Sequence, residues 1–171
     1  LGYKVPLLPV QLLFVNLVTD SFPALCLGME PPEPDVMSSP GKSRHHAIFS
    51  FSSLFEIITQ GMFLGSLALT AYLIGGSTMC FAVLSLSQLV HSFNLRSHHS
   101  LLETGLFGNK KLVLSFLLCA TLQCLVVALE PLQSIFHTQS LSGLQWAIVW
   151  LLSLLPVVLV ELQKYFNKDL I

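Results

Sequence analysis

The chain has 171 residues, of which 53% are hydrophobic and only 10% are charged. A soluble domain carries about 25% charged residues, so this composition excludes an ordinary soluble domain and favours a membrane protein. The formal net charge of −1 argues against nucleic-acid binding, which needs a basic surface. The sequence opens without a basic, cleavable signal pattern and without Met, so we expect a segment of a longer protein.

Five stretches of the sequence are long and apolar enough to cross a bilayer, which takes about 20 residues each. The sequence therefore predicts an all-α fold, a polytopic membrane helix bundle of five transmembrane helices that forms one membrane domain over residues 1–171. The second and third stretches are separated only by the tight turn Gly75-Gly76-Ser77. The predicted spans lie near residues 5–28, 54–75, 77–95, 111–129 and 144–166.

The first span contains the strongest candidate site. Asn16, Thr19 and Asp20 interrupt the apolar segment PVQLLFVNLVTDSFP, and an ionisable residue at membrane depth indicates a functional site. The spacing i, i+3, i+4 places the three side chains on one helical face. Pro23 has no N–H and cannot bond the carbonyl of Thr19, so we expect the helix to be unwound or kinked near its middle.

These groups form an all-oxygen cluster, which suits Ca²⁺, Na⁺ or Mg²⁺ better than Zn²⁺ or Cu²⁺. The alternative interpretation is a hydrogen-bonded cluster that holds neighbouring helices together. Gln88, in the middle of the third span, allows the same two interpretations. It shares a polar stripe with Ser85 and Ser92, and it is either a helix–helix contact or a neutral ligand that faces the first span.

Several other polar or small residues have simpler interpretations. The pair Gly61 and Gly65 permits close helix packing. The four cysteines fall in or beside apolar runs without the spacing of a metal site, so we expect reduced, buried thiols. The paired histidines belong to loops, where we expect them to be solvated. These residues are Cys26, Cys80, Cys119 and Cys124, and His45, His46, His98 and His99.

The basic residues indicate how the spans are oriented, because cytoplasmic flanks carry an excess of Lys and Arg. With five spans, Lys4 falls on one side and all the other basic residues fall on the opposite side. We therefore predict an integral membrane protein with its N-terminus outside or lumenal and its C-terminus in the cytoplasm. The basic residues on the cytoplasmic side are Lys42, Arg44, Arg96, Lys110, Lys111, Lys164 and Lys168.

The segment PVQLLFVNLVTDSFPALCLGMEPPEPDVM resembles the sixth transmembrane helix and following loop of P-type Ca²⁺-transporting ATPases. The resemblance depends on V-N-L-V-T-D, followed by P-A and by L-G-x-x-P-P-x-x-D-x-M. The rest of the chain, with E-P-L-x-x-I-F before the last span, is similar to the C-terminal region of the same pumps. The chain would then be spans six to ten of a ten-span, ATP-driven translocase.

The resemblance implies that Asn16, Thr19 and Asp20 are ligands of the transported Ca²⁺. Gln88 takes an eighth-helix position that is Glu in the sarcoplasmic-reticulum type, and its neutral side chain implies one ion per cycle. The phosphorylation motif D-K-T-G is absent, so the resemblance implies no catalytic or nucleotide-binding residue in this chain. Mg-ATP would be used by domains outside it, and the partners would be the N-terminal part of the same pump and the lipid bilayer.

Two other functions fit the same residues. One is a P-type pump for Mn²⁺, Na⁺ or H⁺, because oxygen ligands alone do not separate these ions. The other is a non-enzymatic membrane carrier or adaptor in which the polar trio only holds helices together.

Overall fold

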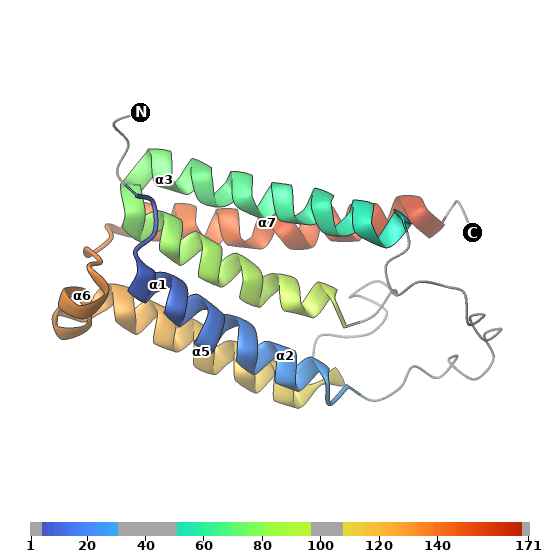
Figure 1. The fold of residues 1–171 in the computed structure, drawn as a ribbon, viewed down its shortest axis with the longest axis horizontal. Coiled ribbons are helices and arrows are strands. Elements are labelled where there is room, and N and C mark those ends of the chain that lie inside the picture. The colour runs from blue at the N-terminus through green and yellow to red at the C-terminus, as the bar shows by residue number, and fades with distance from the viewer. Residues whose placement is uncertain (1–4, 31–50, 97–107, 169–171) are drawn as a thin grey trace.

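The computed structural model describes residues 5–30, 51–96 and 108–168, and every regular element in these ranges is helical. The long helices run side by side along the long axis of the molecule (Figure 1). The predicted all-α membrane helix bundle is confirmed. The elements are α1 (Pro9–Phe14), η1 (Val15–Asp20), α2 (Ser21–Leu27), α3 (Phe51–Asn94), α5 (Lys110–Ala128), α6 (Glu130–Phe136) and α7 (Gly143–Lys168).

Four helical stretches are long and apolar enough to cross a membrane: Pro9–Leu27, Leu54–Asn94, Lys110–Ala128 and Gly143–Lys164. The second has 41 residues, about twice the length that one span needs.

The long stretch turns back on itself at two glycines (Figure 1). Gly75 and Gly76 have non-helical backbone angles, and Gly76 has a φ of 72°, which favours glycine. A Cβ at Gly75 would lie 2.0 Å from the Sδ atom of Met79, so a larger residue does not fit there. Helix α3 therefore consists of two antiparallel arms, residues 51–74 and 77–94. With these arms counted separately, the described residues contain five long helical stretches.

The first span is interrupted in its middle. Helix α1 passes into the π-helical segment η1 before α2 resumes the α-helical form. π-helices use i→i+5 hydrogen bonds and occur mostly as short insertions, often at functional sites. Pro23 is the third residue of α2 and donates no backbone hydrogen bond, so a regular ladder cannot continue through this point. The predicted break is confirmed, and its form is a π-helix.

The two ends of the bundle differ in charge. One end, named here the basic end, holds the ends of α2, α3 and α7 and the start of α5 (Figure 1). Arg96, Lys110, Lys111 and Lys164 lie there. The opposite end, named here the α6 end, holds the start of α1, the Gly75–Gly76 turn and α6. Lys4, Lys42 and Arg44, which were also used to predict sidedness, lie outside the described residues.

The second arm of α3 forms the centre of the bundle. Met79, Phe81, Leu86 and Leu89 on this arm are fully buried. Helix α3 packs against α7, α5 and the π-helical segment. The polar first span is therefore attached to the most buried helix of the molecule.

Helix α6 lies between the fourth and fifth predicted spans, in residues for which the sequence predicted no helix. Leu129 is extended and ends α5. Pro131 then lies at the start of α6, a position that proline favours, and His137 ends this helix in the left-handed conformation. In the sequence, the acidic residue Glu130 followed by Pro131 indicated the start of this helix.

Candidate functional site

The π-helical segment determines where the three predicted ligands point. Thr19 is only 2% exposed, and its Oγ1 donates a 2.8 Å hydrogen bond to the carbonyl of Val15. Asn16 is exposed and Asp20 is half-buried. Because a π-helix has a wider turn than an α-helix, residues i and i+3 no longer share one face. Thr19 therefore turns into the bundle, away from the exposed Asn16.

The backbone carbonyls of this segment receive unusual donors. The hydroxyl of Ser21 donates to the carbonyl of Asn16 over 2.8 Å. The thiol of Cys119, on α5, donates to the carbonyl of Val18 over 3.4 Å. The sequence pointed to an orphan carbonyl at Thr19, four residues before Pro23. In an i→i+5 register the carbonyl that faces Pro23 is that of Val18, and the Cys119 thiol covers it.

The side chains of Asn16 and Asp20 have no hydrogen-bond or ion-pair partner within residues 5–30, 51–96 and 108–168. In the same ranges, no three His, Cys, Asp or Glu side chains lie close enough together to hold a metal ion. A half-buried carboxylate and an exposed amide, both unpartnered, are hard oxygen donors for a cation. The described chain thus supplies part of a coordination sphere.

Gln88 lies on the second arm of α3, the helix that packs against the π-helical segment. The Gln88 side chain is half-buried, and its Oε1 atom is buried without a partner among the described residues. The nearby Ser85 hydroxyl is in the same condition, whereas the Ser92 hydroxyl donates to the carbonyl of Leu89 over 2.7 Å. The structure thus brings the helix of Gln88 to the site, without a hydrogen bond from Gln88 to Asp20 in the described chain.

The outward face of the first span is uncovered. Several exposed leucines lie on this span before and after Asn16, and a shallow, open hollow lies beside α2. The face is apolar apart from the groups of the site, as expected for a membrane helix that contacts lipid or a neighbouring helix. Its exposed leucines are Leu12, Leu13, Leu17 and Leu25, and the hollow is lined by Ser21, Ala24, Leu25, Gly28 and Met29.

Gly61 and Gly65 were predicted to pack closely against another helix. No described atom lies within 4 Å of a Cβ added at either glycine, so no described helix packs closely against them. The paired histidines, His45 with His46 and His98 with His99, lie outside the described residues.

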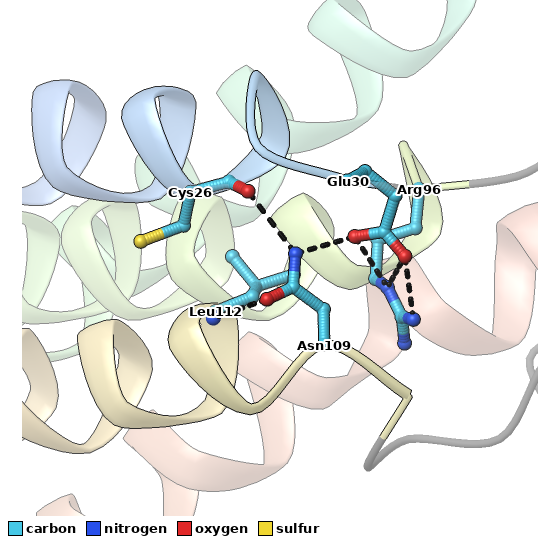
Figure 2. A network of polar contacts seen from close by, with 5 residues as sticks. All are labelled: Cys26, Glu30, Arg96, Asn109 and Leu112. Atoms are coloured by element: carbon cyan, nitrogen blue, oxygen red, sulfur yellow. Dashed lines mark hydrogen bonds and ion pairs between the residues drawn. The ribbon is translucent and has the colours of Figure 1, made fainter. Parts of the chain in front are cut away.

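Sequence reasoning missed the residues that attach the ends of the first span. Gln11 is fully buried near the α6 end. Glu30, Arg96 and Asn109 form a polar network at the basic end (Figure 2). Asn109 lies shortly before an apolar run, a pattern that indicates a helix N-cap. The others had no local signal, because their partners are remote in the sequence.

Comparison with known proteins places the whole chain in one family. Residues 4–166 match the family model described as "Cation transporting ATPase, C-terminus". A calcium-transporting ATPase of Bacillus cereus is 38% identical over 99% of this chain and 22% of its own length. Calcium-transporting ATPases of Bacillus subtilis and Listeria monocytogenes are each 34% identical over 93% of this chain and 19% of their own length. The chain spans about a fifth of these relatives.

Proposed function

Since the chain belongs to the family of cation-transporting ATPases whose C-terminal region it matches, we propose that it forms the last five membrane spans of an ATP-driven Ca²⁺ pump. Its first span supplies Asn16, Thr19 and Asp20 as ligands of the transported ion. The observation that carries this proposal is the π-helical break, which leaves the Asp20 carboxylate half-buried and without a partner in the described chain. A carboxylate in an apolar span needs a cation or a proton.

The missing ligands come from the remainder of the pump, which packs on the uncovered face of the first span. About four-fifths of each bacterial relative lies outside the region this chain matches, so in the relatives the same polypeptide contains a segment of the required size. The exposed leucines beside Asn16 fit that interface. Mg-ATP is used by that remainder, which would carry the D-K-T-G phosphorylation motif of such pumps.

Ion release follows from the same geometry. A broken helix at mid-membrane lets its two halves move separately, as discontinuous helices do in other transporters. When the ligand oxygens separate, the affinity for the cation falls and a proton replaces it on Asp20. Gln88 is a neutral second-arm ligand with no charge to hold another ion, so one Ca²⁺ moves per cycle. The basic end faces the cytoplasm, in line with the excess of Lys and Arg there.

The experiment is Asp20→Asn in the full-length pump. The variant keeps the size of the side chain and removes its charge. Phosphorylation from ATP is measured against free Ca²⁺, and we expect at least a tenfold higher Ca²⁺ requirement. An unchanged requirement would refute the ligand assignment.

Glu56→Gln is the matched control, because Glu56 is an exposed carboxylate on the first arm of α3. It should leave the Ca²⁺ dependence unchanged. The same titrations with Mn²⁺, Na⁺ and H⁺ identify the transported ion. If phosphorylation depends on one of these ions and not on Ca²⁺, that ion is the transported one, and the assignment as a pump still holds.

A further inference from the structure

Three segments that are far apart in the sequence meet at the basic end of the bundle. The carboxylate of Glu30, just beyond α2, accepts hydrogen bonds from the Arg96 guanidinium at 2.8 and 3.2 Å to Oε1 and at 3.3 Å to Oε2. Arg96 follows the last turn of α3. The amide of Asn109, just before α5, donates to the same carboxylate and, over 3.0 Å, to the carbonyl of Cys26 (Figure 2).

Asn109 connects the network to two helices at once. Its side-chain oxygen accepts the backbone N–H of Leu112 over 3.0 Å, so it is the N-cap of α5. Its amide nitrogen binds the carbonyl of Cys26 in the last turn of α2. The carbonyls at a helix C-terminus and the N–H groups at a helix N-terminus lack partners within their own helices, and Asn109 serves one of each.

The ion pair between Glu30 and Arg96 is largely buried, and neighbouring atoms restrict the position of the guanidinium. The side chains of Arg96 and Glu30 are 2% and 20% exposed, and a forked pair of this kind fixes orientation as well as distance. A Cβ at Gly108 would lie 2.7 Å from the Nη2 atom of Arg96. The guanidinium therefore fills the space that a side chain at position 108 would take, and it could not stay in place if that side chain were present.

The α6 end of the first span is also attached. The buried amide of Gln11 donates to the carbonyl of Phe136 over 3.0 Å, and its oxygen accepts the backbone N–H of Leu8 over 3.0 Å and the Ser77 hydroxyl over 3.4 Å. Between these two attachments, the hydroxyls of Thr19 and Ser21 donate to carbonyls of the π-helical segment, within the first span itself.

We propose that Glu30, Arg96 and Asn109 form a clasp that fixes α2 to α3 and α5, so that the first span changes shape at its π-helical segment and not at its end. The three are positioning residues: they act on the cation through Asp20, which immediately precedes α2 at the end opposite the clasp. This role rests on the proposed pump function. Loosening the clasp lets α2 shift with Asp20, and the cation is then bound less tightly.

The test is a Ca²⁺ titration of phosphorylation in the full-length pump with Arg96→Gln, Glu30→Gln and the double variant, each normalised to folded protein. We expect five- to twentyfold more Ca²⁺ at half-maximal phosphorylation and an unchanged maximal level. The double variant should resemble the stronger single variant, because the two residues act through one pair. Gly108→Ala is the milder variant for the case that Arg96→Gln does not fold, and it should shift the titration in the same direction.

Lys111→Gln is the matched control. Lys111 is an exposed cation at the same end, and its Nζ atom lies 3.5 Å from the Sδ atom of Met29. An equal shift in Lys111→Gln would overturn the clasp. It would indicate that the loss of any positive charge at the basic end changes the Ca²⁺ requirement. Unshifted titrations in folded Arg96→Gln and Gly108→Ala would also overturn it, even if both proteins melt at lower temperature.

The pump proposal fails separately, when Ca²⁺ does not drive phosphorylation of the wild type. The clasp is then measured with the cation that does.

Discussion

The ends of the first span and its middle are held in opposite ways. At the ends, polar side chains reach across to other helices: Gln11 to the carbonyl of Phe136, and Glu30 to Arg96. In the middle, the hydroxyls of Thr19 and Ser21 turn back onto their own backbone. The Asp20 carboxylate between them has no partner in the described chain.

This contrast shows which polar groups maintain the fold and which are left for a ligand. A buried polar group without a partner is costly. Within the first span this cost falls on the half-buried Asp20 carboxylate, whereas side chains at both ends of the span have hydrogen-bonded partners. The π-helical break lies at the same place. A site that has to bind and release an ion needs oxygen atoms that the fold itself does not occupy.

The largest effect on stability is expected at the basic end. Glu30→Ala removes the carboxylate that pairs with the buried Arg96 guanidinium, and breaking a buried ion pair costs at most about 3–5 kcal/mol. The melting temperature of the purified pump in detergent measures this loss. A melting temperature equal to that of the wild type would show that the ion pair does not hold this end.

The same ion pair predicts a pH dependence. Burial acts to raise the pKa of the Glu30 carboxyl, but the hydrogen bonds from Arg96 and Asn109 and the positive charge of Arg96 outweigh it and hold the pKa below its ordinary value of 4.5. The folded state therefore gains stability that is present above this pH and is lost as the pH falls through the lowered pKa. The difference in melting temperature between wild type and Glu30→Gln should shrink at acidic pH. A constant difference would contradict the assignment.

At the α6 end, two buried glutamines give a matched comparison. Gln11→Leu leaves the carbonyl of Phe136 without its donor and should destabilise the protein by about 1–3 kcal/mol. Gln123, on α5, is equally buried, but neither polar atom of its side chain has a partner in the described chain. Gln123→Leu should be neutral or stabilising, since it removes unsatisfied groups. If both variants lost the same stability in thermal unfolding, the attachment at Gln11 would have no special role.

These attachments mark the limit of what the sequence predicts. The five long helices follow from hydropathy alone, and the break in the first follows from Pro23, because both depend on residues that are neighbours in the chain. The pair of Glu30 and Arg96 joins residues 66 apart, and the bond from Asn109 to Glu30 joins residues 79 apart. No local pattern specifies such contacts, since they depend on how the helices pack.

The polar trio was predicted in part for the same reason. The spacing of Asn16, Thr19 and Asp20 identifies a polar stripe in an apolar span, but the single face that it implies assumes an α-helix. The i→i+5 register turns Thr19 into the bundle and moves the orphan carbonyl from Thr19 to Val18. This register is a response to Pro23 within the packed bundle, and the residue spacing does not contain it.

Replacing Pro23 shows whether the π-helical form itself tunes the site. Pro23→Ala restores the missing N–H and permits an α-helical ladder through the first span. A proline inside a helix costs up to about 3 kcal/mol relative to alanine, so the variant should melt at the same or a higher temperature. It should also bind Ca²⁺ about tenfold more weakly, because the side chains of the site rotate. Pro156→Ala in α7 is the control and should not change the affinity. An unchanged Ca²⁺ titration in Pro23→Ala would show that ion binding does not depend on the π-helical form.

The smallest effect is expected at Cys119, where the only tie between α5 and the carbonyls of η1 in the described chain is a weak thiol donor. Cys119→Ala leaves the carbonyl of Val18 uncovered, and we expect a loss of about 0.5 kcal/mol, roughly a factor of two in Ca²⁺ affinity. Cys119→Ser supplies a hydroxyl donor at the same place and should keep the wild-type affinity. Cys124→Ala, on the same helix, is the control for loss of a thiol. If serine weakened binding as much as alanine, the size of the sulfur atom would matter more than its hydrogen bond. The middle of the first span would then be held against α5 by packing and not by a hydrogen bond. It would differ even more from the two ends of the span, which are attached by hydrogen bonds.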